Sequence, residues 1–88
     1  MAHYMIEASH DPAQCMQMLD QYADESRKLL EAAEFGCKSG VHTAWATVEA
    51  SSEDEARMML PMSQRNSARV VRVEKMTPEA IRQMHMAA

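Results

Sequence analysis

A two-residue alternation over residues 41–50 constrains the fold of this chain more than any other feature of its sequence. One side of this segment carries His42, Ala44, Ala46 and Val48, and the other carries Val41, Thr43, Trp45, Thr47 and Glu49. Such a period is typical of a β-strand whose two faces meet different surroundings. A shorter alternation over residues 3–9 sets Tyr4, Ile6 and Ala8 against His3, Met5, Glu7 and Ser9. The chain is therefore predicted to contain a sheet with two unlike faces.

A helical pattern lies between these two strands. Asp11 and Pro12 suit the N-cap and first position of a helix, and Gln14 completes a capping box. No Gly or Pro follows until Gly36, which we expect to end the helix in the left-handed conformation. Its apolar stripe would comprise Cys15, Met18, Leu19, Tyr22, Ser26, Leu29, Leu30 and Ala33. A helix over residues 12–34, about 22 residues, would span about 33 Å and cross a whole sheet face.

The connection between this helix and the strand at residues 41–50 is predicted to be a β-hairpin. Residues 35–38 would form its short first strand, with Ser39-Gly40 as a two-residue turn. In that register Cys37 lies directly opposite His42, with Cβ atoms about 4.5–5.5 Å apart.

The second half of the chain predicts a helix, a strand and a last helix. Ser52 and Glu55 form a capping box for a short helix that Pro61 ends. Residues 62–67 form a polar connection, and residues 68–75 form a β-branched strand. Thr77-Pro78-Glu79 begins a last helix whose buried side would be Ile81 and Met84.

This order of elements, β-α-β-β-α-β plus a terminal helix, predicts an α+β fold. We expect a ferredoxin-like sandwich with an extra C-terminal helix, in one domain over residues 1–88. A domain of this size buries only about 60% of its unfolded surface, so self-association would help its stability. The uncovered sheet face would carry Met5, Glu7, Thr43, Trp45 and Thr47. Such a mixed face suits a homodimer interface or the floor of a ligand pocket.

Charge and composition exclude several classes of function. The net charge of −4 argues against nucleic-acid binding, which requires phosphate neutralisation. No apolar run approaches the roughly 20 residues of a membrane helix, and residues 1–10 do not resemble a signal peptide. We therefore expect a cytoplasmic protein with no membrane partner, in which the two cysteines are thiols or ligands, not a structural disulfide.

Cys37, His42 and His10 form the candidate metal site. His10 follows the first strand, and in the expected strand order the end of that strand lies near His42. Cys15 or Asp11, in the first turn of the helix, would be a fourth group. Thiolate and imidazole ligands suit zinc, nickel or copper, and do not suit calcium or magnesium.

Other interpretations of these residues stay open. Cys37 can be a small buried apolar residue and His42 a strand-end residue, or the two can form a reactive thiol–imidazole pair. Ten methionines are present; they serve either as adaptable core residues or, at Met84-His85-Met86, as a copper(I) site. Trp45 can pack or stack on a ligand, and Glu7 can be solvated or act as an acid–base group.

One stretch of the chain resembles a group of small bacterial and archaeal proteins. It runs from Gly36-Cys37-Lys38-Ser39-Gly40 through His42 and Trp45, and is followed by Glu55-Ala56-Arg57 and Leu60-Pro61. The group brings no established activity with it. More distantly, the layout is similar to the dimeric α/β-barrel superfamily, which includes cofactor-free monooxygenases, isomerases and a small nickel-binding family. This resemblance implies a dimer in which open sheet faces pack together and enclose pockets.

Three functions follow from these features, and whether the protein is an enzyme stays open. The first is a homodimer that binds a transition metal or small ligand near Cys37, His42 and His10. The second is a small cofactor-free enzyme, similar to an oxygenase or isomerase, with an open-face pocket lined by Glu7, Trp45, Thr43 and Met5. The third is a non-catalytic regulatory or assembly module.

Overall fold

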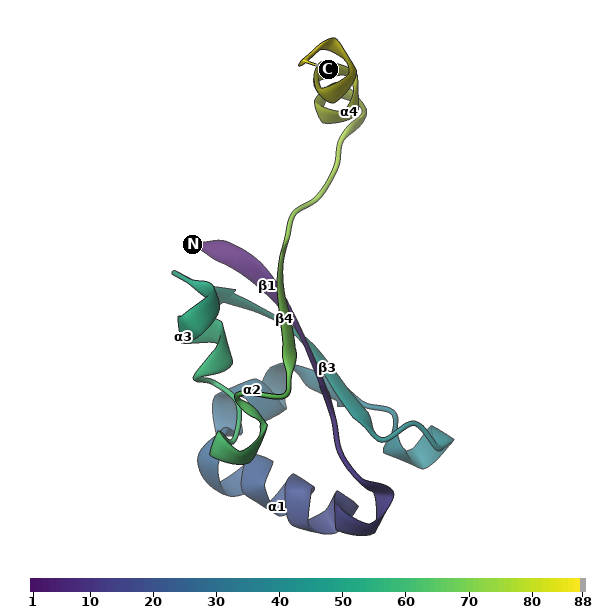
Figure 1. The fold of residues 1–88 in the computed structure, drawn as a ribbon, viewed down its shortest axis with the longest axis vertical. Helices are drawn as coiled ribbons and strands as arrows, with labels where there is room; N and C mark the ends of the chain where they lie inside the picture. The colour runs from purple at the N-terminus through teal and green to yellow at the C-terminus, as the bar shows by residue number, and fades with distance from the viewer. Residues whose placement is uncertain (88) are drawn as a thin grey trace.

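A four-stranded antiparallel sheet forms the centre of the computed structural model, which describes residues 1–87 (Figure 1). The strands are β1 (Ala2–Ser9), β2 (Ala33–Phe35), β3 (Thr43–Ala50) and β4 (Arg69–Val73), in the spatial order β2-β3-β1-β4. The helices are α1 (Cys15–Glu25), α2 (Arg27–Ala32), α3 (Glu53–Arg57) and α4 (Pro78–Ala87), with 3-10 turns η1 (Pro12–Gln14), η2 (Cys37–Ser39) and η3 (Met62–Gln64). The α+β prediction is confirmed, and the strand order is compatible with a ferredoxin-like arrangement.

The two faces of the sheet differ as the alternation predicts. β1 pairs with β3 from Ala2↔Ala50 to Ser9↔Thr43, and with β4 from His3↔Val73 to Glu7↔Arg69. One face carries the buried residues Tyr4, Ile6, Ala8, Ala44, Ala46, Val48 and Val70. Helices α1, α2 and α3 lie on one side of the sheet (Figure 1). The buried face is therefore the helix-covered face, and no helix in residues 1–87 covers the other.

The single long helix predicted over residues 12–34 is wrong. The chain forms η1 and then α1, leaves the helical conformation at Ser26 (φ −133°, ψ 44°), continues as α2 and enters β2 at Ala33. A straight 22-residue helix of about 33 Å would extend past strands of eight residues, which span about 27 Å. The break lets Tyr22 before it and Leu29 after it both reach the core.

A buried polar contact ties α1 to the loop before β4. The Tyr22 hydroxyl donates a 2.6 Å hydrogen bond to Gln64 Oε1, and Gln64 Nε2 donates a 3.0 Å bond to the Ser9 carbonyl. Gln64 is only 2% exposed. The segment predicted as a polar connection therefore contains a core residue whose amide is satisfied on both sides.

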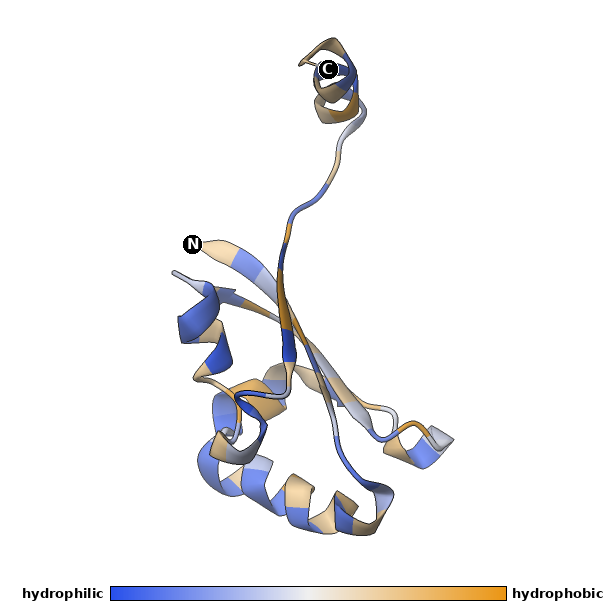
Figure 2. Ribbon diagram, in the orientation of Figure 1, coloured by the Kyte–Doolittle hydropathy of each residue, from blue (hydrophilic) through white to orange (hydrophobic). Residues whose placement is uncertain are grey.

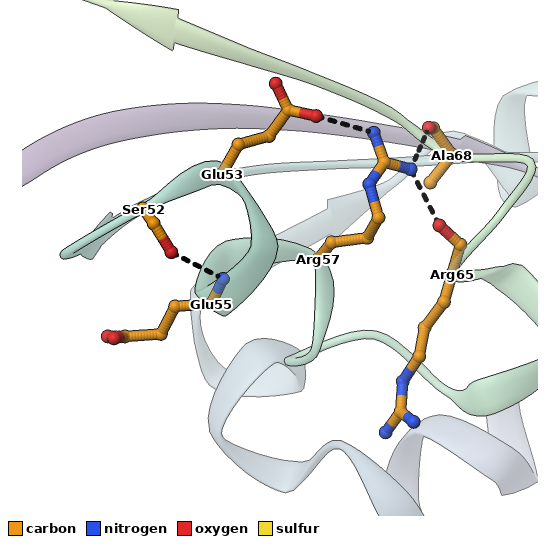
Figure 3. Close-up of polar contacts among 6 residues, drawn as sticks. All are labelled: Ser52, Glu53, Glu55, Arg57, Arg65 and Ala68. Atoms are coloured by element: carbon orange, nitrogen blue, oxygen red, sulfur yellow. Dashed lines mark hydrogen bonds and ion pairs between the residues drawn. The ribbon is translucent and has the colours of Figure 1, made fainter.

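Helix α3 begins at the predicted cap and is fastened by an arginine (Figure 3). The Ser52 hydroxyl accepts from the Glu55 amide at 3.1 Å, as the capping box predicts. Arg57 Nη1 donates to the carbonyls of Arg65 and Ala68 at 2.7 and 2.8 Å. These bonds hold α3 against the loop that leads into β4.

Helix α4 stands apart from the sheet on an extended segment (Figure 1). The prediction that Ile81 and Met84 form a buried side is wrong, because they are 45% and 59% exposed. Figure 2 shows apolar residues on this helix although it is remote from the core. No helix within residues 1–87 combines the length and apolarity needed to cross a membrane.

Candidate metal centre

Four side chains from four different segments meet at one end of the sheet. His10 follows β1, Cys15 is the first residue of α1, Cys37 is the first residue of η2, and His42 precedes β3. Each offers one ligand atom, and these four atoms all lie within 4.8 Å of one another. The predicted trio of Cys37, His42 and His10 is thus brought together, and Cys15 joins it.

Strand pairing positions the two histidines. The His10 amide donates a 3.0 Å hydrogen bond to the His42 carbonyl, which continues the β1–β3 ladder one step past Ser9↔Thr43. The two imidazole rings meet edge to face, with centroids 5.3 Å apart and planes at 71°. Their proximity therefore follows from the strand order that the sequence predicts.

Asp11 positions Cys15 but does not join the cluster. Its Oδ1 accepts a 2.8 Å hydrogen bond from the Ala13 amide, which caps the turn η1. This turn reverses the chain after His10 and places the first residue of α1 beside the imidazole. Of the two fourth groups that the sequence suggests, the thiol of Cys15 is the one in the cluster.

The predicted two-residue hairpin at Ser39-Gly40 is wrong. Strand β2 ends at Phe35, which pairs with Ala44, and the connection to β3 contains the 3-10 turn η2. Cys37 therefore lies in this turn and is not the cross-strand partner of His42. The loop nevertheless carries Cys37 to the cluster.

Two glycines permit this loop. Gly40 has φ +85°, the left-handed conformation that the prediction assigned to Gly36. Gly36 itself has φ −91°, and its amide donates to the Thr43 carbonyl. A Cβ on Gly36 would lie 2.7 Å from the Val41 carbonyl oxygen and 3.0 Å from the Trp45 ring. The close return of the loop requires glycine at position 36.

The spacing of the ligand atoms fits a tetrahedral ion. Metal–ligand distances of about 2.3 Å to sulfur and 2.0–2.1 Å to nitrogen place tetrahedral ligand atoms about 3.3–3.8 Å apart. Cys37 Sγ lies 3.6 Å from His10 Nε2, within that range. The largest separation allowed by the 4.8 Å limit would need to close by about 1 Å, which side-chain rotation can supply.

Burial and mutual proximity favour the neutral forms of the His10 imidazole and the Cys37 thiol. Burial is the main cause that lowers the pKa of His10, and the neighbouring His42 lowers it further, while Asp11 acts in the opposite direction. Burial also raises the pKa of the Cys37 thiol, and contact with the Cys15 thiol adds to this rise. A neutral imidazole is ready to bind a metal, whereas the thiols must release protons to do so.

Both imidazoles retain a buried nitrogen without a partner. Among the described residues, Nδ1 of His10 and Nδ1 of His42 have no hydrogen-bond partner. A buried polar atom left in this state costs free energy unless an ion or a water satisfies it. For His10 the ring nitrogen that faces the Cys37 thiol is Nε2, so its buried Nδ1 is the second nitrogen of the ring.

The residues predicted to line a ligand pocket differ in their exposure to solvent. Glu7, Trp45 and Met5 are exposed on the uncovered sheet face, where Trp45 Nε1 donates a 3.0 Å hydrogen bond to Glu7 Oε2. Thr43 is buried, and its hydroxyl lies 3.0 Å from that of Ser9. Shallow depressions border Met5, Trp45 and Glu7 on this face.

The other histidines and the methionine-rich end lie elsewhere. His3 pairs with Glu49 at 3.6 Å on the uncovered face. Met84, His85 and Met86 are exposed residues of α4.

Comparison of the chain with protein-family models, curated proteins and solved structures finds no match.

Proposed function

We propose that this protein binds a transition-metal ion through His10, Cys15, Cys37 and His42. The observation that carries this proposal is the gathering of two sulfur and two nitrogen ligand atoms within 4.8 Å, from segments up to 32 residues apart in sequence (10 to 42). Zinc is the ion whose usual donor set and tetrahedral geometry this arrangement fits. Nickel and copper share these donors, whereas calcium and magnesium prefer oxygen.

The ligand count favours binding over metal-dependent catalysis. Four protein ligands fill a tetrahedral shell, whereas a catalytic zinc keeps one position for water or substrate. The ion would connect the end of β1, the start of α1, the turn η2 and the start of β3. Because the ligands converge only in the folded chain, metal binding would stabilise the fold.

Metal analysis of the untagged protein tests this proposal. Purified protein is examined by elemental analysis, and metal-free protein is titrated with Zn²⁺, Ni²⁺ and Cu⁺ in a calorimeter. We expect an equimolar amount of ion in the wild type and strongly reduced binding in Cys37→Ala and His42→Ala. His85→Ala, which removes a histidine exposed on α4, is the matched control and should bind normally.

Two results would count against this proposal. Folded, reduced, metal-free wild-type protein that shows no affinity for any of the three ions contradicts the proposal. Equal binding by the wild type and by both cluster variants contradicts the assignment of the ligands.

We also propose that the fold is the ferredoxin-like sandwich of a dimeric α/β barrel, as the resemblance implies. The strand order β2-β3-β1-β4 supports it, as does the coverage of one sheet face by α1–α3. Met5, Trp45 and Val71 are 37–40% exposed on the other face. A second copy of the chain, packed face to face, would bury these apolar side chains.

Light scattering across a range of protein concentrations tests the dimer. We expect a dimer for the wild type and a monomer for Val71→Arg, which adds a charge to the uncovered face in the middle of the edge strand β4. A wild type that stays monomeric at high concentration contradicts this proposal. An open-face enzyme pocket would lie in the same interface, so a dimer whose faces interlock without a void counts against that function.

A further inference from the structure

We propose that Cys15 and Cys37 form a reversible disulfide when no metal is bound, so that the cluster is also a two-electron redox site. Neither cysteine is in a disulfide in this structure, and both are partly exposed. Their sulfur atoms belong to the group of ligand atoms that lie within 4.8 Å of one another. They are the only cysteines in the sequence, so the pairing is unambiguous.

The local geometry allows the two sulfur atoms to meet. A disulfide needs a sulfur–sulfur distance of about 2.05 Å, and the rest of the approach can come from rotation of the two side chains between staggered rotamers. Cys37 lies in the loop between Gly36 and Gly40, and Cys15 is the first residue of α1. Both thiols therefore sit at the ends of elements, where small backbone shifts disturb little of the core.

A hydroperoxide is the oxidant in the proposed reaction. One cysteine sulfur attacks the peroxide oxygen, breaks the O–O bond, and becomes a sulfenic acid as water or an alcohol leaves. The second sulfur then attacks the sulfenic sulfur and releases water as the S–S bond forms. The two sulfurs lose two electrons and two protons in total, and the peroxide accepts them. A dithiol such as reduced thioredoxin or dithiothreitol reverses the change by exchange.

Metal binding and disulfide formation would exclude each other. A disulfide removes both thiolate ligands and leaves only the imidazoles of His10 and His42. Conversely, a bound ion holds the sulfurs as ligands and withholds them from the oxidant. This coupling rests on the proposed metal binding, whereas the disulfide itself rests only on the proximity of the thiols.

Oxidation of the metal-free protein tests the disulfide directly. Reduced, metal-free protein is treated with equimolar hydrogen peroxide and digested with trypsin under non-reducing conditions. Cleavage after Arg27, Lys28 and Lys38 places Cys15 in the peptide 1–27 and Cys37 in the peptide 29–38. We expect loss of both thiols, an intact mass smaller by two hydrogen atoms, and a cross-linked pair of these peptides that dithiothreitol separates.

The Cys15→Ser variant is the control for the mechanism. It keeps Cys37 but lacks the second thiol, so peroxide should add oxygen to Cys37 or join two chains. Wild-type protein that gains oxygen on each cysteine separately, or that forms mainly inter-chain disulfides at low protein concentration, overturns the inference.

A zinc-loaded sample separates this inference from the proposed function. We expect the cross-linked peptide to form at least about tenfold more slowly in that sample, because a metal-bound sulfur is less available as a nucleophile. Zinc binding without any cross-link in the metal-free sample overturns the inference and leaves metal binding intact. A cross-link in protein that binds no metal overturns the proposed metal binding and leaves the disulfide inference intact.

Discussion

At the scale of single residues, Gly36 and Gly40 shape the loop that carries Cys37. Gly40 supplies a left-handed conformation, and the space around its missing Cβ is open. Gly36 has an ordinary backbone conformation but lies against the Val41 carbonyl and the Trp45 ring. The two glycines are therefore required for different physical reasons, and substitutions at the two positions should have different consequences.

We predict that Gly36→Ala destabilises the protein by about 1–3 kcal/mol, because its Cβ must push the loop away from β3. The same shift moves Cys37, so metal affinity should fall with stability. Urea denaturation and zinc titration measure the two effects. Gly40→Asn is the control, because asparagine tolerates the left-handed conformation. Equal loss of metal affinity in both variants would contradict a steric role for position 36.

The buried hydroxyl of Tyr22 makes the free energy of unfolding fall with rising pH in the alkaline range. Burial raises the pKa of Tyr22 to about 12, above the value of about 10 for an unfolded tyrosine. The folded state therefore holds this proton more tightly, and the resulting stability is complete below pH 10 and is lost as the pH rises toward 12. From the shift, we expect the free energy of unfolding to fall by about 1 kcal/mol between pH 9 and pH 11.

The Tyr22→Phe variant isolates this effect. At pH 8 it should be less stable by about 1–3 kcal/mol, because Gln64 Oε1 loses its buried donor. The gap between variant and wild type should narrow between pH 9 and pH 11 in urea-denaturation experiments. A gap that stays constant over this interval would show that the Tyr22 proton does not contribute.

Three of the four clustered ligands are predictable from the sequence, but not for entirely correct reasons. His10 and His42 meet because the first and third strands pair, which the alternation predicts. The sequence predicts the position of Cys37 through a cross-strand register that the loop does not have. For the fourth group the sequence leaves two candidates, Cys15 and Asp11. The capping role of Asp11 is predicted by Asp11-Pro12 and is confirmed at the turn η1, where its carboxylate accepts from the Ala13 amide and is not among the clustered ligands.

At the scale of elements, the sequence predicts the order of strands and helices better than their lengths. Apolar periodicity places Ser26 within the helical stripe, and nothing in its neighbours marks a break there. The break arises because α1 and α2 must both pack on a sheet shorter than one straight helix. Such tertiary demands override local helix propensity, which also explains why Gln64 is buried in a segment that looks like a surface loop.

Arg57 is the main polar link between α3 and the chain that enters β4. We predict that Arg57→Ala costs about 2–3 kcal/mol, because two carbonyls lose a charged donor. Arg57→Lys should recover only part of this loss, since an ammonium lacks the planar geometry of the guanidinium. Urea denaturation measures both. Recovery of full stability by lysine would show that charge alone matters at this position.

At the scale of the whole molecule, the chain divides into a packed body and a projecting helix. Helix α4 has no buried residue, and the longest dimension of the molecule, 50 Å against 28 and 21 Å, runs through it. An isolated helix of ten residues is marginal in water. The exposure of α4 cannot be predicted from the sequence, because an amphipathic pattern does not reveal which surface the apolar side contacts.

We predict that truncation after Met76 leaves the body of the protein nearly unchanged in stability, within about 0.5 kcal/mol. The comparison is made by urea denaturation at concentrations where both proteins are monomeric. A loss well above this value would mean that α4 packs on its own sheet in solution. The same truncated protein should bind zinc as the full chain does, because all four ligands precede position 43.

The hydrogen bond from the His10 amide to the His42 carbonyl lies at the end of a ladder, where strands ordinarily fray. An ion held by the side chains of the same two residues would close that end. The exchange of this amide hydrogen with solvent would then slow when zinc is added, while amides of the edge strand β4, which carries none of the four ligands, would exchange as before. A single backbone proton would thus record whether the centre is filled.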